Sequence, residues 1–263
     1  MSKIKETAKV ISQEKLAQDI YSMWIETGIA KEAVPGQFIS VYTKSEARLL
    51  PRPISICETG DNSLRIVYRI AGKGTEEFAQ YKEGDRVDIL GPLGNGFPLT
   101  EIEDKCCNDT EESGPILIGG GIGIPPMLEL AKQLKGKVTI VVGYRDADMF
   151  LDEELKKYGR LVIATDDGSV GTKGNVIDAI KEQGVEGSVI CACGPIPMLR
   201  GIKAYAAENG IEAYISMEER MACGVGACLG CVCRSEEVDD HSRVKNKRIC
   251  KDGPVFKATE VEL

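Results

Sequence analysis

This sequence of 263 residues is short of aromatic residues, of histidine and of long apolar runs. Aromatic side chains make up 5% of it, with one Trp, and the single histidine, His241, lies in a charged stretch where we expect it to be solvated. No apolar run approaches the roughly 18 residues that span a bilayer, and the charged first residues lack the apolar core of a signal peptide. We therefore expect a cytoplasmic protein that has no membrane segment.

The sequence also lacks an excess of positive charge. It has 33 Lys and Arg against 41 Asp and Glu, which gives a net charge of −8. A protein that grips a phosphate backbone needs a basic face, so nucleic acid is not an expected partner. The hydrophobic content of 43% is that of an ordinary globular protein with real cores.

Cysteine, by contrast, is abundant, with ten residues. Ten cysteines would indicate disulfides in a small secreted domain, but this chain is longer and shows no signal peptide, so we expect reduced thiols. Four of them, Cys223, Cys228, Cys231 and Cys250, follow the pattern C-x4-C-x2-C with a distant fourth cysteine, which is the plant-type spacing for a [2Fe-2S] cluster. Glycines between the first three suit a tight loop whose backbone N–H groups approach sulfur. The spacing therefore predicts a one-electron carrier.

Two other interpretations of these cysteines stay open. A structural zinc site usually combines two C-x2-4-C pairs or mixes Cys with His, and here only Cys228 and Cys231 form such a pair. However, Cys233 supplies a further thiol, so a four-thiolate zinc site in an interaction module is one alternative, and a set of buried, inert thiols is the other. We expect Cys233 to be a spectator, because the cluster pattern is complete at Cys231. The adjacent Cys106 and Cys107 lie in a polar stretch and are assigned no function.

Two patterns of secondary structure follow one another along the chain. Short β-branched or alternating segments, separated by turn residues, run to about residue 100 and indicate a closed antiparallel barrel. From residue 115 onward, apolar strands alternate with helical segments, which predicts a parallel sheet covered on both faces. We expect a β-barrel over residues 1–104, an acidic linker near 106–114, an α/β nucleotide domain over 111–215 and a small cysteine domain over 216–263.

A glycine-rich turn, Gly119-Gly120-Gly121-Ile122-Gly123, follows the first strand of the α/β segment. Such a turn lets a diphosphate approach the backbone and the next helix's N-terminus. It is not the G-x-G-x-x-G fingerprint, and a merely tight strand–helix connection is the alternative. Cys193-Gly194-Pro195 ends the fourth strand and therefore faces the same edge of the sheet, where ligands of α/β proteins bind. A buried core cysteine before a turn is the alternative there.

Two short motifs stand out in the barrel segment. Arg52-Pro53-Ile54-Ser55 places a cation and a hydroxyl on one strand, and Gly74-Thr75 begins a helix. Together these groups suit an isoalloxazine ring and a diphosphate. Either fragment alone would be read as an exposed arginine or a helix cap.

The order of these motifs resembles that of the ferredoxin–NADP reductase superfamily over nearly the whole chain. With the cysteine loop and the terminal Cys250-Lys-Asp-Gly-Pro-Val-Phe, the sequence is most similar to the electron-transfer subunits of type B (NAD-dependent) dihydroorotate dehydrogenases. The resemblance implies an FAD site, a nicotinamide dinucleotide site and a [2Fe-2S] site. The implied FAD residues are Arg52, Pro53, Ile54, Ser55, Arg69, Ile70, Ala71, Gly74 and Thr75; the implied NAD residues are Gly119, Gly120, Gly121, Gly123, Cys193, Gly194 and Pro195; the implied cluster ligands are Cys223, Cys228, Cys231 and Cys250.

The resemblance also implies a route for electrons. A nicotinamide exchanges two electrons as hydride and an iron–sulfur cluster exchanges one at a time, so a flavin, which does both, belongs between them. We expect electrons to pass from the FMN of a dihydroorotate dehydrogenase catalytic subunit through the cluster and FAD to NAD+ in pyrimidine biosynthesis. The resemblance implies a heterotetramer with two copies of each subunit. FAD would be the reactive group of this oxidoreductase subunit, and no side chain is assigned as catalytic, although Cys193 would lie near the nicotinamide.

NAD is expected rather than NADP. After the second α/β strand, residues 143–154 hold one arginine, Arg145, and five acids, which is an unfavourable setting for a 2′-phosphate. The rival function is a related subunit of an NAD(P)H:ferredoxin or sulfide oxidoreductase with the same cofactors. Those relatives can carry an aspartate at a cluster-ligand position, whereas all four cysteines are present here.

Overall fold

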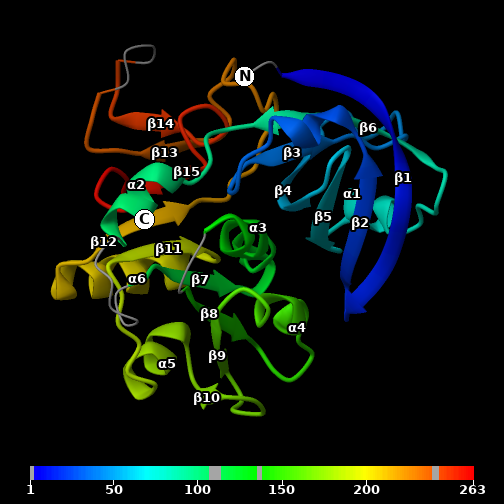
Figure 1. The fold of residues 1–263 in the computed structure, drawn as a ribbon. Coiled ribbons are helices and arrows are strands. Elements are labelled where there is room, and N and C mark those ends of the chain that lie inside the picture. The colour runs from blue at the N-terminus through cyan, green and yellow to red at the C-terminus, as the bar shows by residue number, and fades with distance from the viewer. Residues whose placement is uncertain (1–2, 107–113, 135–137, 239–242) are drawn as a thin grey trace.

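A computed structural model describes residues 3–106, 114–134, 138–238 and 243–263. Cys107, His241 and most of the predicted linker lie outside these ranges. Within them, the chain forms a barrel, a larger sheet with helices on both faces, and a small part near the C-terminus that carries the cysteine motif (Figure 1). No helix in these ranges has the length and apolar character needed to cross a membrane.

The N-terminal part is a closed barrel of six strands, as predicted. Its order is β1-β2-β5-β4-β3-β6, and every neighbouring pair is antiparallel. The strands are β1 (Ile4–Ala17), β2 (Ile20–Glu26), β3 (Phe38–Val41), β4 (Arg52–Thr59), β5 (Ser63–Arg69) and β6 (Arg86–Leu93), with the short helices η1 (Gly28–Lys31) and α1 (Lys73–Phe78) between strands. Alternate side chains such as Val10, Met23, Ile39, Ile66 and Ile89 fill the interior.

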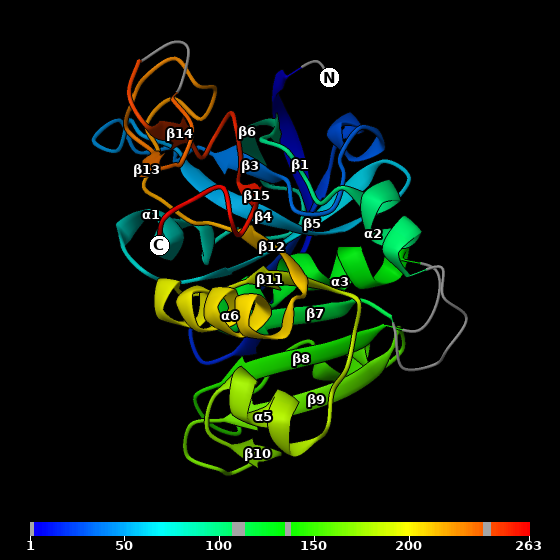
Figure 2. The ribbon, with the colours of Figure 1, turned by 90° about the vertical axis from the view of Figure 1, so that its left-hand side faces the viewer.

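The second part is a seven-stranded sheet in the order β10-β9-β8-β7-β11-β12-β15. Its parallel strands are β7 (Ile116–Gly120), β8 (Thr139–Tyr144), β9 (Arg160–Thr165), β10 (Thr172–Lys173), β11 (Val189–Cys193) and β12 (Glu212–Ser216). The helices are α3 (Pro125–Gln133), α4 (Asp152–Leu155), α5 (Val176–Glu182) and α6 (Ile196–Asn209), with α2 (Leu99–Lys105) and η2 (Gly121–Gly123) at connections. The helices α5 and α6 cover one face, which is turned to the viewer in Figure 2, and α3 and α4 cover the other (Figure 1). The predicted parallel sheet with two covered faces is confirmed.

The C-terminal part ends in a strand of the large sheet. It contains the two-stranded sheet β13 (Val232–Arg234) and β14 (Asn246–Arg248), but the chain then returns to the large sheet. The strand β15 (Val255–Lys257), which the sequence does not predict, pairs antiparallel with β12. The cysteine-bearing segment is therefore joined to the nucleotide domain at both of its ends.

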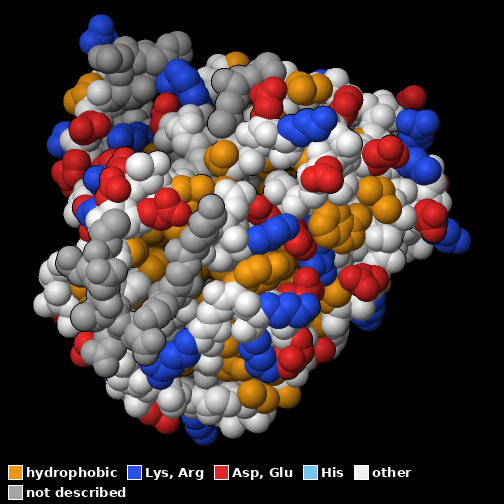
Figure 3. Space-filling model, viewed as in Figure 1, with side chains coloured by type: hydrophobic (Ala, Val, Ile, Leu, Met, Phe, Trp, Pro, Cys, Tyr) orange, Lys and Arg blue, Asp and Glu red, His pale blue; other side chains and the backbone are white. Residues whose placement is uncertain are grey.

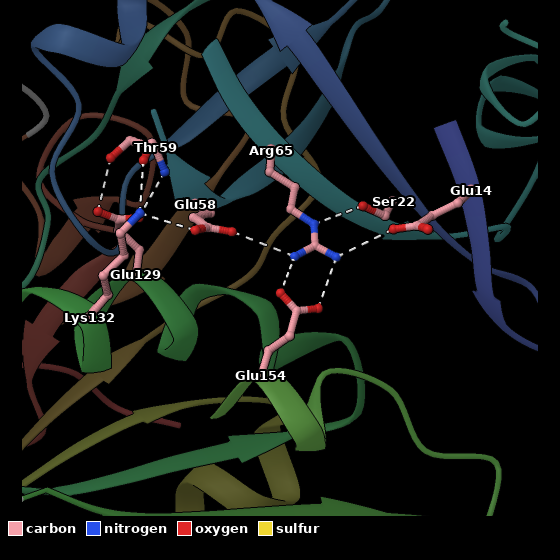
Figure 4. Close-up of polar contacts among 8 residues, drawn as sticks. All are labelled: Glu14, Ser22, Glu58, Thr59, Arg65, Glu129, Lys132 and Glu154. Carbon is pink, nitrogen blue, oxygen red and sulfur yellow. Dashed lines mark hydrogen bonds and ion pairs between the residues drawn. The ribbon is translucent and has the colours of Figure 1, made fainter. Parts of the chain in front are cut away.

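A buried arginine joins the barrel to the nucleotide domain. Arg65 on β5 donates through Nη1 and Nη2 to the two carboxylate oxygens of Glu154 on α4, at 2.6 and 3.1 Å (Figure 4). Its Nε donates to Ser22 Oγ at 2.8 Å, and Glu58 and Glu14 lie within 3.7 Å of the guanidinium. Because both nitrogens meet one carboxylate, the pair fixes orientation as well as distance.

A second contact joins the barrel to α3. The carboxylate of Glu129 accepts from the backbone N–H of Thr59 at 2.8 Å and from its hydroxyl at 2.9 Å. Lys132, one turn later, donates to Glu58 at 3.0 Å (Figure 4). The glycine-rich turn directly precedes α3, so these contacts fix the position of that turn against the barrel.

The outer surface carries both signs of charge. On the face seen in Figure 3, acidic and basic side chains are interspersed. Some charged side chains form exposed pairs, such as Lys73 with Glu76 at 2.8 Å and Arg234 with Glu262 at 3.9 Å. Such pairs add little stability, because water screens them.

Candidate functional site

A cleft of about 520 Å³ lies between the barrel, the glycine-rich turn and the segment that follows β12. It brings together many of the residues predicted for FAD, together with residues that the sequence did not indicate. Its lining comprises Phe38, Arg52, Pro53, Ile54, Ser55, Val67, Tyr68, Arg69, Ala71, Thr75, Ile122, Ser216, Met217, Glu218, Glu219, Arg220, Met221 and Pro254. Seven of the nine predicted FAD residues thus share one cavity, and Ile70 and Gly74 are not in its lining.

The guanidinium of Arg52 lies against the first turn of α1. A Cβ atom added to Gly74 would come within 2.1 Å of Arg52 Nε, so only glycine leaves room for the arginine there. The arginine therefore adds its positive charge to the first turn of α1, where the N–H groups of a helix have no intrahelical partners. This is a setting that attracts an anion such as a diphosphate, and it fits the predicted FAD site.

Thr75 has a structural role as well as a place in the cleft. Its hydroxyl accepts from the N–H groups of Ala71 and Gly72, at 2.9 and 3.2 Å, and donates to the Gly72 carbonyl. The hydroxyl therefore holds the loop before α1 in shape. Ile70, which is not in the cleft lining, donates its N–H to the carbonyl of Asp19 in the β1–β2 turn.

The two predicted nucleotide motifs lie side by side. Their strands β7 and β11 are paired with Gly119 opposite Cys193. A Cβ on Gly123 would come within 2.3 Å of the Cys193 carbonyl oxygen. One on Gly194 would come within 2.3 Å of Met198 Cε and within 3.3 Å of the Gly120 nitrogen. Glycine at 123 is thus required by the close packing of one turn against the other.

Gly121 differs from its neighbours. Its φ of +53° lies in the left-handed region, and a Cβ there would meet no atom within 4 Å. It is therefore the glycine of this turn whose backbone faces open space. The next residue, Ile122, lines the cleft, so the turn borders the predicted FAD site.

The segment from Ser216 to Met221 was missed as part of the site. It continues from the carboxyl end of β12 and lines the cleft. The rule that ligands of α/β sheets bind beyond the carboxyl ends of strands is the sequence signal that points to it. Burial raises the pKa of Glu218 in this segment, and the nearby Arg69 only partly offsets the effect.

Cys193 lies at the same edge of the sheet, opposite Ser216 in the pairing of β11 with β12. The thiol is fully buried, and this burial raises its pKa. Glu218 raises the pKa further, whereas a hydrogen bond with Ser216 lowers it. A neutral, buried thiol in this position fits both of the roles considered for it, a core side chain and a neighbour of the dinucleotide.

The acidic segment after β8 is largely occupied by contacts within the protein. Glu154 binds Arg65, and Asp148 accepts from the Gln18 N–H at 2.7 Å. Asp152 and Glu153 pair with Lys156, and Asp146 accepts from the N–H of Asp148. All five acids therefore have partners in the chain, and the sequence argument for NAD over NADP from their charge is correspondingly weak.

The four predicted cluster cysteines form two pairs. The Cys228 and Cys223 sulfurs are 3.3 Å apart, and the Cys250 N–H donates to the sulfur of Cys231 at 3.5 Å. In the described ranges, no three His, Cys, Asp or Glu side chains converge as ligands of a single metal ion. Two pairs of thiols suit the two irons of a [2Fe-2S] cluster, which together take four cysteines.

Backbone N–H groups surround these sulfurs. The Cys223 sulfur accepts from Val225 and Cys228, at 3.5 and 3.4 Å, and the Cys250 sulfur accepts from Gly226 at 3.2 Å. Although burial raises the pKa of Cys223, these donors outweigh it and lower the pKa to about 6. The hydrogen bond with Cys250 lowers the pKa of Cys231 to about 6. The loop thus favours the thiolate, the form that ligates metal, at Cys223 and Cys231. The same hydrogen bond with Cys231 raises the pKa of Cys250.

A buried arginine, Arg248, forms a hydrogen bond with the cysteine loop. Arg248 donates from Nη1 to the Gly226 carbonyl at 3.1 Å, and its Nε lies 3.3 Å from the Asp252 carboxylate. Gly226 has a φ of +81°, which glycine adopts readily.

Cys233 has a different partner, because its thiol donates to the carbonyl of Lys247 across β13 and β14 at 3.6 Å. This contact fits the expectation that Cys233 is a spectator.

Two family models match the chain. The iron–sulfur cluster binding domain of dihydroorotate dehydrogenase B matches residues 218–262, which include all four paired cysteines. The oxidoreductase NAD-binding domain matches residues 117–204, which include the glycine-rich turn and Cys193-Gly194-Pro195. The first match therefore corresponds to the cysteine-bearing segment of the fold, and the second to the large sheet with its helices.

Among solved structures, one titled for the NADH-dependent reduced ferredoxin-NADP oxidoreductase superposes with a TM-score of 0.82 at 30% identity and covers 98% of this chain and 90% of its own. A ferredoxin NADP+ reductase from Neisseria gonorrhoeae with bound FAD and NADP superposes with a TM-score of 0.63 at 15% identity and covers 83% of this chain and 95% of its own. The second likeness shows the fold alone, the barrel followed by the nucleotide domain.

Curated relatives match the chain over nearly its full length. The "Dihydroorotate dehydrogenase B (NAD(+)), electron transfer subunit" of Fusobacterium nucleatum is 41% identical and covers 98% of both chains. The protein of the same name from Bacillus velezensis is 43% identical and covers 97% of both. With this identity across the barrel, the nucleotide domain and the cysteine loop, the chain belongs to the family of dihydroorotate dehydrogenase B (NAD+) electron transfer subunits.

Proposed function

We propose that this chain carries electrons from the FMN of a dihydroorotate dehydrogenase catalytic subunit, by way of a [2Fe-2S] cluster and FAD, to NAD+ in pyrimidine biosynthesis. The proposal places the chain in the cytoplasm, in a heterotetramer with two copies of each subunit. A flavin supplies the change from one-electron to two-electron transfer, because it exchanges single electrons with a cluster and hydride with a nicotinamide.

The observation that carries the proposal is the shared cleft. Its wall is made by the barrel residues predicted for FAD, by Ile122 of the glycine-rich turn and by the segment from Ser216 to Met221. That segment ends two residues before Cys223, the first cysteine of the loop. Groups suited to a flavin, a dinucleotide and a cluster are thus neighbours, which is what transfer of electrons between them requires.

The proposal gives each cofactor its own residues. Arg52 and the first turn of α1 would bind the FAD diphosphate, and Pro53, Ile54, Ser55, Arg69 and Ala71 would line the rest of its site, with Thr75 holding the loop. Gly121 would let the dinucleotide approach the backbone, and Cys193-Gly194-Pro195 would border the nicotinamide. Cys223 and Cys228 would ligate one iron, and Cys231 and Cys250 the other.

The assignment of NAD+ as the acceptor rests on the sequence identity to the curated relatives more than on the acidic side chains after β8. The relatives that share 41–43% identity carry NAD(+) in their names, whereas the acids after β8 are occupied by contacts within this chain. The catalytic partner follows in the same way, from the word subunit in those names.

Purification of the native chain together with its partners tests the proposal. The chain should co-purify with an FMN-containing enzyme, contain FAD and two irons per chain by the cluster assignment, and confer NAD-linked oxidation of dihydroorotate on that enzyme. Cys250→Ser should abolish the cluster, and Cys233→Ser should retain it. Full NAD-linked turnover by the catalytic subunit without this chain would reject the proposal.

A second function is favoured by one structural neighbour. The structure titled for the NADH-dependent reduced ferredoxin-NADP oxidoreductase matches 98% of the chain, so a related subunit that serves ferredoxin or sulfide chemistry is the alternative. Its identity of 30% is below the 41–43% of the curated relatives. Electron transfer to NADP+ or from ferredoxin at rates above those with dihydroorotate dehydrogenase would favour the alternative.

A further inference from the structure

Ser40 on β3 has a hydroxyl group that is fully buried and has no hydrogen-bond partner among the described residues. Buried polar groups are paired in the great majority of cases, because an unpaired one loses its hydration without compensation. An orphaned hydroxyl next to a predicted cofactor site is therefore free to bond a group that is not part of the polypeptide.

The side chain of Ser40 points away from the barrel interior. Along β3, side chains alternate between the two faces of the strand. Ile39 and Val41 belong to the apolar interior of the barrel, whereas Phe38 packs with the buried side chains around the cysteine loop. Ser40 shares the outward face with Phe38, so its hydroxyl lies on the barrel wall that supports the C-terminal part.

The cysteine loop packs against this face of the barrel at Ser40. A Cβ atom added to Gly224 would lie 3.0 Å from Ser40 Oγ and 3.3 Å from Leu93 Cδ1. Gly224 follows Cys223, the first cysteine of the motif, and has a φ of +67°. Phe38, Leu90 and Leu93 of the barrel belong to the same apolar cluster as Cys223 and its neighbours.

The flavin cleft does not supply the missing partner. Ser40 is paired with Pro53 on β4, which lines the cleft, but neither Ser40 nor Gly224 belongs to the lining. The hydroxyl thus lies beside the predicted flavin site, whose lining includes Phe38 of the same strand, but on the side of the cysteine loop. The cysteine sulfurs, as they stand, do not pair with it either. Gly224, which lies against the hydroxyl, belongs to the loop that would hold the cluster, and the inorganic sulfur of that cluster is an acceptor outside the polypeptide.

We propose that Ser40 donates a hydrogen bond from the barrel to a sulfide of the cluster on the Cys223 side, and that this bond raises the reduction potential of the cluster. The inference rests on the proposed assignment of a [2Fe-2S] cluster to the four cysteines. Added negative charge on reduction strengthens a hydrogen bond to sulfur, so the donor stabilises the reduced form.

The test is the variant Ser40→Ala in the cluster-loaded complex with its catalytic subunit. Redox titration followed by electron paramagnetic resonance should give a lower cluster potential, with the ratio of reduced to oxidised cluster changed about tenfold, which is about 59 mV for a one-electron couple. The FAD potential should not change. In D2O, electron–nuclear double resonance of the reduced cluster should lose one exchangeable deuteron relative to the unmodified protein.

Thr172→Val is the matched control. Thr172 on β10 also has a buried hydroxyl without a partner among the described residues, but it lies at the opposite edge of the large sheet. Its cluster potential should equal that of the unmodified protein. An unchanged potential in Ser40→Ala, an equal shift in Thr172→Val, or a shift of the flavin potential alone would overturn the role of Ser40. Unmodified protein that contains no cluster would overturn the cluster assignment as well.

Discussion

Arg65 in the barrel and Glu154 in the nucleotide domain meet through two parallel hydrogen bonds, of 2.6 and 3.1 Å, although 89 residues separate them in the chain. The arginine side chain is 5% exposed and the glutamate 35%. The pair lies where α4 abuts the barrel, on the same interface as the contact of α3 with Thr59. The two parts that form the cleft are therefore joined by oriented polar contacts as well as by apolar packing.

Removing the carboxylate of Glu154 should destabilise the protein. Glu154→Ala leaves the buried Arg65 without its bidentate partner, and we expect a loss of about 2–3 kcal/mol in the free energy of unfolding. Glu153→Ala is the control, since Glu153 is exposed and pairs only at the surface with Lys156. Its loss should stay within about 0.5 kcal/mol. Urea unfolding of both variants measures the difference, and equal losses would contradict the importance of the pair.

The contact of Arg52 with Gly74 leads to a prediction about FAD. In Gly74→Ala the new Cβ would overlap the guanidinium, so the arginine must leave the start of α1. We expect FAD affinity to fall at least about tenfold, equivalent to about 1.4 kcal/mol, in a titration that follows flavin fluorescence. Gly72→Ala is the control, because its backbone is extended and its Cβ would meet no atom within 4 Å. Unaltered affinity in Gly74→Ala would argue against an arginine–diphosphate contact.

The packing of the two nucleotide turns can be tested in the same manner. Gly123→Ala would force a methyl group against the Cys193 carbonyl, and we expect it to cost at least about 2 kcal/mol of stability and to weaken NAD+ binding. Gly201 lies within the helix α6, where a Cβ would make only an ordinary contact at 3.9 Å. Gly201→Ala should therefore stabilise the protein by up to about 1 kcal/mol. The two variants should shift the thermal midpoint in opposite directions, and a shared direction would be inconsistent with the close approach.

The raised pKa of Glu218 gives a stability difference that depends on pH. A carboxyl whose pKa is higher in the folded state favours folding below its unfolded pKa, and this contribution is lost as pH rises through the folded pKa. Relative to Glu218→Gln, the unmodified protein should therefore lose stability as pH rises above the ordinary titration range of a carboxyl group. Thermal midpoints measured over that rise in pH show the trend, with Glu219→Gln as the neighbouring control. A difference that stays constant with pH would show that Glu218 is not perturbed by burial.

Much of the fold could be predicted because its signals are local. The alternation in the first hundred residues and the apolar strands after Pro115 each follow the period of one type of structure. The strand β15 could not be predicted in this way. Its three residues, Val255–Lys257, carry no period, and they form a strand only because the edge of β12 offers them partners.

The site could be predicted where a sequence pattern is specific to one kind of site, and could not where the same residue type serves several roles. The cysteine spacing indicated the cluster because few other sites use that pattern. The acids of residues 143–154 were less informative, since a carboxylate serves equally to repel a phosphate, cap a backbone or bind an arginine such as Arg65. The segment from Ser216 to Met221 has no motif of its own, and its place in the cleft depends on how the sheet meets the barrel.

The order of electron transfer is the central claim, and one variant tests it most directly. In Cys228→Ser the cluster should be lost while the FAD cleft, whose lining includes none of the four cysteines, stays intact. In the anaerobic complex with the catalytic subunit, dihydroorotate should then no longer yield NADH, whereas added NADH should still reduce the bound FAD at the rate of the unmodified protein. Undiminished NADH formation from dihydroorotate by a complex shown to lack the cluster would contradict the proposed route.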